Sequence, residues 1–224
     1  MYFVNPSDLL IGDILLYRPE FPNCVQKKIQ QKTKSPYTHA AIYIGGGYIA
    51  ESVAWPFLWG VRRYKLSKSI KGSSCIAIFR NQLGFNPFRD NKLQEFVNIT
   101  ISNKKFYNLK SALHLESRAS QYFGNQLEYI NNNFNLVESD SSYYDRSFFC
   151  SSFVVACLAY VGIIGFSARV AYNPNFFSPG ALYKDPTFGW FLGYLSIKNG
   201  TVSPNDPILK NSTKWADNLS VKWW

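Results

Sequence analysis

The sequence predicts an α+β fold, in which a central antiparallel sheet packs against an apolar helix that carries a cysteine. Two segments predict this arrangement. Residues 38–53, THAAIYIGGGYIAESV, place two β-prone runs on either side of three glycines, which is typical of a hairpin. Residues 149–161 are almost continuously apolar and end at Gly162, a common residue at the end of a helix. Hydrophobic residues make up 46% of the chain, which is enough for a packed core.

The elements around the hairpin follow from the same kinds of pattern. A strand is expected at 13–17 and a helix at 22–32, with apolar side chains on one face and lysines on the other. This helix should end before Pro36, because the residue preceding a proline avoids the α region. A third strand is expected at 74–79, SCIAIF.

The second half of the chain alternates helical and turn-rich segments. Helices are expected at 92–99 and 109–122, followed by a polar loop at 131–147. A loop of that length in a compact domain is often functional. Short strands are expected near 189–197, and residues 199–224 predict a loosely structured tail. The sequence shows no internal repeat and no low-complexity tract.

The charge balance limits the classes of partner. With 24 basic and 14 acidic residues, the net charge of +10 favours anionic partners such as nucleic acid, anionic lipid or a bacterial cell wall. A solvated basic surface without a specific partner explains the charge equally well. The densest group of lysines, Lys27, Lys28, Lys32 and Lys34, is spaced like one face of a helix. Because the chain has no recognition helix, zinc-finger or RNA-binding motif, no nucleic-acid partner is expected.

Other features of the sequence predict the location of the protein and whether it binds a metal or a cofactor. The first 20 residues have no basic start, long apolar core or cleavage site, so no signal peptide is expected. No run approaches the roughly 18 apolar residues of a membrane span, so no integral membrane segment is expected. The protein is expected to be cytoplasmic as synthesised, and any delivery to the periplasm or to a target cell would use a leaderless secretion route. With four cysteines outside CxxC spacing and two histidines, neither a metal nor a cofactor is expected.

Cys150 is the candidate nucleophile. It lies where the polar loop turns into the apolar helix, in RSFFCSSFVVACLAYVG. A cysteine in the first turn of a helix faces unpaired backbone N–H groups and the positive end of the helix dipole, and both favour the reactive thiolate. The alternative is a small buried cysteine with no chemical role. That alternative suits Cys157 better, since it lies two turns deeper in the apolar run.

His39 is the candidate base. It opens the strand THAAIYIG, where burying an imidazole among apolar residues is costly unless its nitrogens are paired. The alternative is a core histidine with satisfied hydrogen bonds. His114, the second histidine, lies in an amphipathic helical segment and is expected at the surface.

Hairpin parity gives Glu51 as the third member. If the turn is Gly45-Gly46-Gly47, Ala41 pairs with Glu51, and His39 and Glu51 become diagonal neighbours on one face. The carboxylate would then accept the imidazole N–H and fix its tautomer. A two-residue turn would move Glu51 to the other face, where it would be an ordinary edge carboxylate.

Four segments taken together resemble the circularly permuted NlpC/P60 (papain-like) cysteine hydrolases, including the YiiX-like and lecithin:retinol acyltransferase-like groups. These segments are GDILLYRP at 12–19, SPYTHAAIYIGGGYIAES at 35–52, FFCSSFVVACLAYVG at 148–162 and SPGAL at 178–182. In unpermuted relatives the cysteine helix precedes the histidine strand, and here the order is reversed. The resemblance implies a single permuted catalytic domain over 1–224, with a family-variable insertion at 85–145 and a C-terminal extension at 186–224.

The resemblance also implies a reaction, acyl transfer through a thioester on Cys150, with His39 as base and Glu51 as the orienting residue. The first expectation for the substrate is peptidoglycan, with an amidase or endopeptidase cleaving the stem peptide. The basic charge suits an anionic wall, and a leaderless basic hydrolase resembles a secreted antibacterial effector with an immunity or delivery partner.

Two alternatives remain open at this stage. A phospholipase or lipid acyltransferase would use a long apolar groove at Cys150, and aromatic pairs such as Phe57 with Trp59 or Phe176 with Phe177 could then hold acyl chains. A catalytically inactive binding module would have a misplaced Glu51 or a blocked Cys150. Similarity of fold alone does not decide among these substrates.

Overall fold

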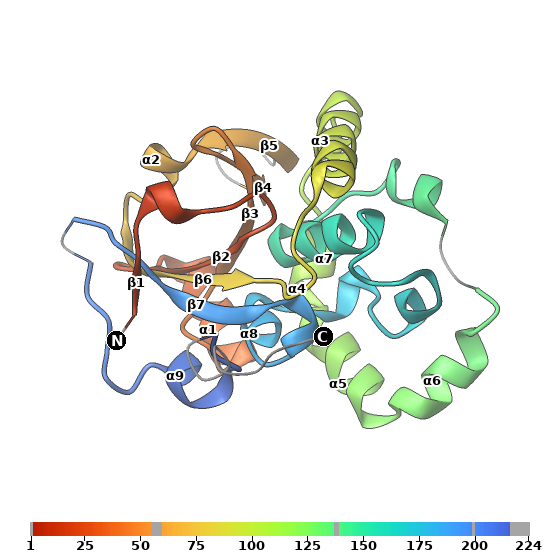
Figure 1. Cartoon of the computed structure of the whole chain (residues 1–224). Helices are drawn as coiled ribbons and strands as arrows, with labels where there is room; N and C mark the ends of the chain where they lie inside the picture. The colour runs from red at the N-terminus through yellow and green to blue at the C-terminus, as the bar shows by residue number, and fades with distance from the viewer. Residues whose placement is uncertain (1, 55–59, 137–138, 199, 216–224) are drawn as a thin grey trace.

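The computed structural model describes residues 2–54, 60–136, 139–198 and 200–215, and it confirms a mixed α+β architecture. The strands of this part of the chain form one sheet in the order β1-β7-β6-β2-β3-β4-β5 (Figure 1). Strand β1 is parallel to β7, and every other neighbouring pair is antiparallel. The strands are β1 Phe3–Val4, β2 Ile14–Pro19, β3 His39–Gly45, β4 Tyr48–Val53, β5 Gly60–Lys65, β6 Ser73–Arg80 and β7 Trp190–Leu195.

Helices surround this sheet, and α5 and α6 lie farthest from it, at the lower right of Figure 1. The α-helices are α1 Cys24–Thr33, α2 Leu66–Ser69, α3 Pro87–Ser102, α4 Leu109–Leu113, α5 Leu115–Gly124, α6 Gln126–Asn133, α7 Cys150–Tyr160, α8 Pro179–Leu182 and α9 Pro207–Asn211. Short 3₁₀ helices are η1 Pro6–Asp8, η2 Asp140–Tyr143, η3 Phe166–Val170, η4 Pro174–Phe176 and η5 Pro186–Phe188.

The two faces of the sheet bury two separate hydrophobic clusters. Successive residues of a strand point to opposite faces, so Ala40 and Ile42 of β3 join the cluster that contains α7, while Ala41 and Tyr43 join the other. Every residue of α7 is buried, which explains why its sequence is apolar all round rather than on one stripe. The helix is therefore fixed to the sheet over its whole length.

Helix α1 begins and ends through local interactions of its own residues. The Asn23 side chain accepts a hydrogen bond from the Gln26 backbone N–H at 2.9 Å, and the Gln26 side chain accepts one from the Asn23 backbone N–H at 2.9 Å. Lys34 then adopts a left-handed conformation with φ of 48°, which stops the helix before Pro36. None of the residues of α1 is fully buried.

The structure corrects several sequence expectations. Strand β5 was not expected, because its charged sequence GVRRYK hides the alternation of a strand. The helix expected at 109–122 is broken at His114, whose ψ of 7° is not helical, into α4 and α5. The loop expected at 131–147 begins with the last residues of α6 and contains η2.

The C-terminal segment is also more ordered than expected within the residues that are described. Asp206 caps helix α9, since its side chain accepts the backbone N–H of Ile208 at 3.0 Å, and both residues are buried. The Tyr37 hydroxyl donates to Asp206 at 3.1 Å and so ties this segment to the loop before β3. The pairs Phe57–Trp59 and Trp223–Trp224 lie outside the described residues.

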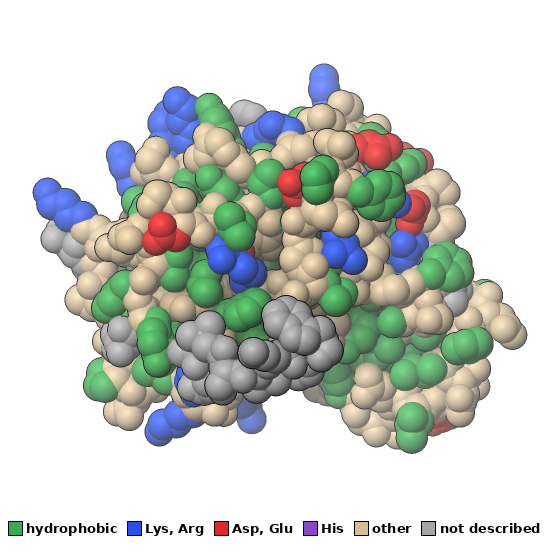
Figure 2. All heavy atoms as spheres, viewed as in Figure 1, with side chains coloured by type: hydrophobic (Ala, Val, Ile, Leu, Met, Phe, Trp, Pro, Cys, Tyr) green, Lys and Arg blue, Asp and Glu red, His purple; other side chains and the backbone are tan. Residues whose placement is uncertain are grey.

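No helix in the described ranges has both the length and the apolar character needed to cross a bilayer. On the face shown in Figure 2, lysine and arginine side chains are spread over the margin and the centre rather than gathered into one dense block.

Candidate active site

Cys150 is the first residue of α7, as its position in the sequence predicted. Phe149, in extended conformation, precedes it, and the Ser152 hydroxyl accepts the Phe149 backbone N–H at 2.9 Å. The backbone N–H groups of Ala40 and Ser151 lie close enough to the Cys150 sulfur to favour its thiolate form. Cys150 is only 5% exposed, so this charge is stabilised by the protein rather than by bulk water.

His39 and Glu51 meet across the β3–β4 hairpin. The Nε2 atom of His39 lies 2.7 Å from Oε2 of Glu51, and Glu51 is 3% exposed. His39 also lies close enough to the Cys150 thiol for each group to shift the pKa of the other. Because Nε2 is engaged by Glu51, Nδ1 is the ring nitrogen left to face the sulfur. The structure thus brings together the three residues that the sequence analysis singled out.

The register of the hairpin differs from the expected one in an informative way. Ala41 pairs with Glu51, as expected, but Gly45 pairs with Tyr48 and the turn is the two-residue Gly46-Gly47. Ile44 is an extra, unpaired residue in β3, and this β-bulge restores the parity that a two-residue turn would otherwise change. Glu51 therefore stays on the face of His39.

Arg62 is a part of the site that the sequence analysis missed. It lies directly opposite Glu51 in the neighbouring strand β5. Its Nε and Nη2 atoms donate to Oε1 of Glu51 at 2.9 and 2.7 Å, which leaves Oε2 for His39. The Arg62 guanidinium also stacks over the Tyr64 ring, 4.1 Å from its centroid, and this contact holds it in place. The alternation of side chains along GVRRYK would have placed Arg62 beside Glu51, but only if a strand had been predicted at β5.

These contacts shift the pKa value of each of the three residues so that its charged form is favoured. Burial disfavours the charged imidazole, but Cys150 and Glu51 outweigh it and raise the pKa of His39 to about 10. Burial also opposes the charged forms of Glu51 and Cys150. The neighbouring positive charges nevertheless hold the pKa of the Glu51 carboxyl and of the Cys150 thiol below their ordinary values. The arrangement therefore favours an imidazolium–thiolate pair at neutral pH.

The other candidates have no such environment. Burial raises the pKa of the Cys157 and Cys75 thiols, so neither is activated. Cys24 is exposed on α1, and His114 is an exposed residue between α4 and α5. Within the described ranges, no group of three His, Cys, Asp or Glu side chains is arranged to hold a metal ion.

Tyr107 is a second residue that the sequence analysis missed. Its hydroxyl lies within hydrogen-bonding reach of the backbone N–H and the thiol of Cys150. Burial and the Cys150 charge raise the pKa of Tyr107 well above its ordinary value, so the hydroxyl keeps its proton. No local pattern marks Tyr107, because it lies in the connection between α3 and α4 and reaches Cys150 only through the fold.

Two backbone contacts hold the Tyr107 segment in place. The Asn108 backbone N–H donates to the Phe148 carbonyl at 3.1 Å, which joins this segment to the residues just before α7. On the other side, the Lys105 carbonyl packs against Gly60, where a Cβ would collide with it. Gly60 also has a φ of +79°, a conformation that favours glycine.

An apolar cavity of about 520 Å³ opens beside Cys150. Its walls come mainly from α1, α4 and the start of α7. The apolar residues that line it are Val25, Ile29, Ala54, Leu109, Ala112, Leu113, Leu115, Phe149 and Pro179. The Lys32 ammonium donates to the Leu113 carbonyl at 3.1 Å and so connects α1 with α4.

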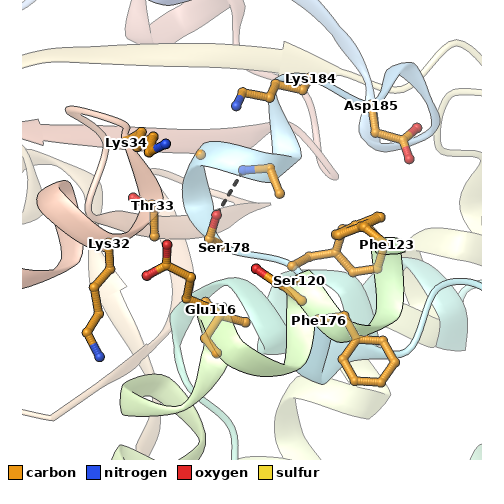
Figure 3. A pocket seen from close by; sticks show the side chains of 15 residues that line it. Lys32, Thr33, Lys34, Glu116, Ser120, Phe123, Phe176, Ser178, Lys184 and Asp185 are labelled. Atoms are coloured by element: carbon orange, nitrogen blue, oxygen red, sulfur yellow. Dashed lines mark hydrogen bonds between the residues drawn. The ribbon is translucent and has the colours of Figure 1, made fainter. Parts of the chain in front are cut away.

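A second hollow of about 510 Å³ adjoins this cavity and shares Lys32, Thr33, Leu115 and Glu116 with it (Figure 3). Lys32, Lys34 and Glu116 lie on one side of the hollow, Phe123 and Phe176 lie on the other, and Lys184 and Asp185 lie along its upper edge in Figure 3. At its edge the Ser178 hydroxyl accepts the Ala181 N–H at 3.0 Å. The apolar cavity beside Cys150 therefore continues into a hollow whose lining combines charged and aromatic side chains.

The imidazolium–thiolate pair predicts an unusual pH dependence of thiol alkylation. The lowered pKa of Cys150 and the raised pKa of His39 favour the thiolate, so its rate with iodoacetamide should reach a plateau at a lower pH than the rate of an ordinary cysteine does. An ordinary thiol gains reactivity as the pH rises through about 8.5. The rate is measured by peptide mass spectrometry in a Cys24→Ser background.

His39→Ala removes the positive charge beside the sulfur. We expect the rate at pH 7 to fall at least about tenfold and the midpoint to rise, since one unit of pKa changes the thiolate fraction tenfold. His114→Ala is the matched control and should leave the profile unchanged. A wild-type profile that follows a model cysteine peptide would contradict the assignment.

Comparisons with known proteins give a limited result. No protein-family model matches the chain, and no curated protein does. Among solved structures, the chain is similar to the crystal structure of metalloprotein yiiX from Escherichia coli O157:H7, DUF1105, with a TM-score of 0.44 and 19% sequence identity. The match covers 79% of this chain and 93% of that chain. Assignment to the permuted NlpC/P60 group stays a prediction.

Proposed function

We propose that this protein is a cysteine-dependent acyl hydrolase or acyltransferase, with Cys150 as nucleophile, His39 as proton carrier and Glu51 as the residue that orients His39. The Cys150 thiolate attacks the carbonyl carbon of the substrate, and the carbonyl π electrons move to oxygen to give a tetrahedral oxyanion. When this intermediate collapses, the bond to the leaving group breaks, and the His39 imidazolium gives it a proton. A thioester on Cys150 remains.

The second half of the cycle reverses these roles. Neutral His39 takes a proton from water, or from an acceptor hydroxyl or amine, as that group attacks the thioester carbonyl. Collapse of the second tetrahedral intermediate breaks the C–S bond and regenerates the thiolate beside the imidazolium. Glu51 stays ionised throughout, because Arg62 neutralises the oxygen that His39 does not use.

Tyr107 and the Cys150 backbone N–H supply donors for the oxyanion. Both groups are close to the Cys150 sulfur, and the oxyanion of a substrate bonded to that sulfur would form near them. The raised pKa of Tyr107 keeps its hydroxyl a donor across the working pH range. Such donors stabilise the transition state more than the neutral carbonyl of the substrate.

The apolar cavity beside Cys150 is the observation that carries the choice of substrate. A space of about 520 Å³ whose walls are mostly apolar suits an acyl chain, although Lys28, Lys32 and Glu116 also line it. The adjoining hollow, which holds both signs of charge, suits the polar part of the same molecule. An amphiphilic lipid ester therefore fits both spaces, whereas a polar stem peptide would leave the apolar walls without contacts. The peptidoglycan amide predicted from the sequence is the second candidate, since the net charge of +10 would attract an anionic wall.

Substrate assays with a nucleophile variant test this proposal. We expect the wild-type protein to release fatty acid from mixed micelles of a dioleoyl glycerophospholipid, and Cys150→Ala to reduce the rate at least about 10³-fold. Cys157→Ala, two turns along the same buried helix, is the matched control and should retain turnover. Fatty acid is measured by mass spectrometry, in parallel with muropeptide analysis of purified sacculi.

The outcomes of this assay are separable. Muropeptide products without fatty acid would replace the lipid assignment by the peptidoglycan one and keep the mechanism. Undiminished turnover in Cys150→Ala would contradict the mechanism itself.

Tyr107→Phe tests the oxyanion donor separately. Loss of one such donor lowers kcat by about 10²–10³-fold, and KM should change little because the neutral substrate does not depend on it. The control is Tyr144→Phe, which removes a hydroxyl that bonds Tyr160 at 2.9 Å. Steady-state kinetics distinguish the two, and an unchanged kcat in Tyr107→Phe would exclude this role.

A further inference from the structure

The mouth of the Cys150 cavity carries exposed apolar side chains that the reaction itself does not need. Val25 of α1 is 54% exposed although it lines the cavity, and Leu113 of α4 is 47% exposed in the same position. Phe21, just before α1, is 84% exposed, and Phe106, just before α4, is 67% exposed. Phe21 precedes the cavity-lining Val25 by four residues, and Phe106 directly precedes the cavity-lining Tyr107, so both exposed rings belong to segments that form the cavity wall. Exposed apolar side chains beside a cavity are a common feature of binding surfaces.

The same two segments carry a one-sided charge. Residues 21–34 contain four lysines and residues 103–113 contain three, and neither segment contains Asp or Glu. The two segments therefore carry seven positive charges and no negative one, whereas the net charge of the whole protein is +10. The acidic groups nearby include Glu20, which directly precedes Phe21, Glu116 in the cavity wall, and Asp145, which lies 3.6 Å from Lys105. We call residues 21–34 and 103–113 the rim.

The structure joins the two halves of the rim around one opening. Side chains from both segments line the same cavity as Cys150, and the Lys32 bond to the Leu113 carbonyl connects them. Figure 3 shows Lys32 and Lys34, at the end of the first rim segment, beside the adjoining hollow. The rim thus combines exposed apolar side chains, an excess of lysine and the entrance to the proposed site.

We propose that the rim docks on the surface of an anionic lipid bilayer, so that Cys150 takes its acyl substrate directly from that surface; the second part rests on the proposed function. Apolar side chains such as Phe21 and Phe106 would enter the interfacial layer, and the lysines would face anionic headgroups. A second copy of this chain is a poorer occupant, because two rims of the same positive charge repel. The rim works as a peripheral contact and needs no membrane-spanning helix.

Vesicle flotation with the Cys150→Ala protein tests the docking. Because this variant has no nucleophile, binding is scored whether or not any lipid is cleaved. We expect binding to phosphatidylcholine vesicles that contain about 30% phosphatidylglycerol, weak binding to phosphatidylcholine alone, and a strong loss in about 0.5 M salt.

Rim variants and matched controls locate the contact. Phe21→Ser with Phe106→Ser, and separately Lys27→Glu with Lys110→Glu, should each weaken partitioning at least about tenfold. The controls Leu83→Ser with Phe88→Ser, and Lys68→Glu with Lys71→Glu, change equally exposed side chains elsewhere and should stay within about twofold. Circular dichroism confirms that each variant is folded.

Three results would overturn the proposal: equal binding by rim and control variants, no preference for anionic vesicles, or a dimer that only the rim variants dissociate. Failure of fatty-acid release with intact, rim-dependent vesicle binding would instead reject the proposed lipid chemistry and keep the docking surface.

Discussion

The buried carboxylate of Glu51 is the constraint on which the rest of the site depends. A carboxylate that is 3% exposed is stable as an anion only if its oxygens are paired, and here Arg62 takes one oxygen and His39 the other. The pairing with Arg62 keeps Glu51 ionised, and the pairing with His39 fixes the ring. Since Nε2 is then occupied, the ring can present only Nδ1 to Cys150.

Three strands and one helix position the residues that make these contacts. The β-bulge at Ile44 keeps Glu51 on the face of His39, and β5 places Arg62 directly opposite Glu51. Helix α7 is buried along its full length, and this burial fixes its first residue, Cys150. The Cys150 sulfur thus lies beside the Thr38 carbonyl, just before β3. The charges therefore meet in a preorganised arrangement, which is what electrostatic catalysis requires.

Sequence reasoning reached the parts of the site that are encoded locally. The start of an apolar helix identified Cys150, and strand parity identified His39 with Glu51, although the expected three-residue turn was wrong and a bulge supplies the same register. Arg62 was missed because charged residues disguise β5. Tyr107 could not be found from sequence, because its place depends on contacts between segments far apart in the chain.

The substrate, like Tyr107, could not be predicted from the sequence alone. Net charge is a property of composition and suggests anionic partners of several kinds, while the apolar cavity and its rim exist only once α1, α4 and α7 are packed together. An effector role, a leaderless secretion route and an immunity partner have no counterpart in the packing of side chains and stay predictions.

Titration of His39 by nuclear magnetic resonance tests the central claim most directly, because the chain has only two histidines and His114→Gln assigns the other signal. The account predicts that both ring nitrogens of His39 carry protons at pH 7, that the ring loses a proton only near its pKa of about 10, and that Cys150→Ser or Glu51→Gln lowers that value. A His39 ring that is neutral at pH 7 and titrates near about 6.5 in wild type would contradict the account, because no imidazolium–thiolate pair would then exist.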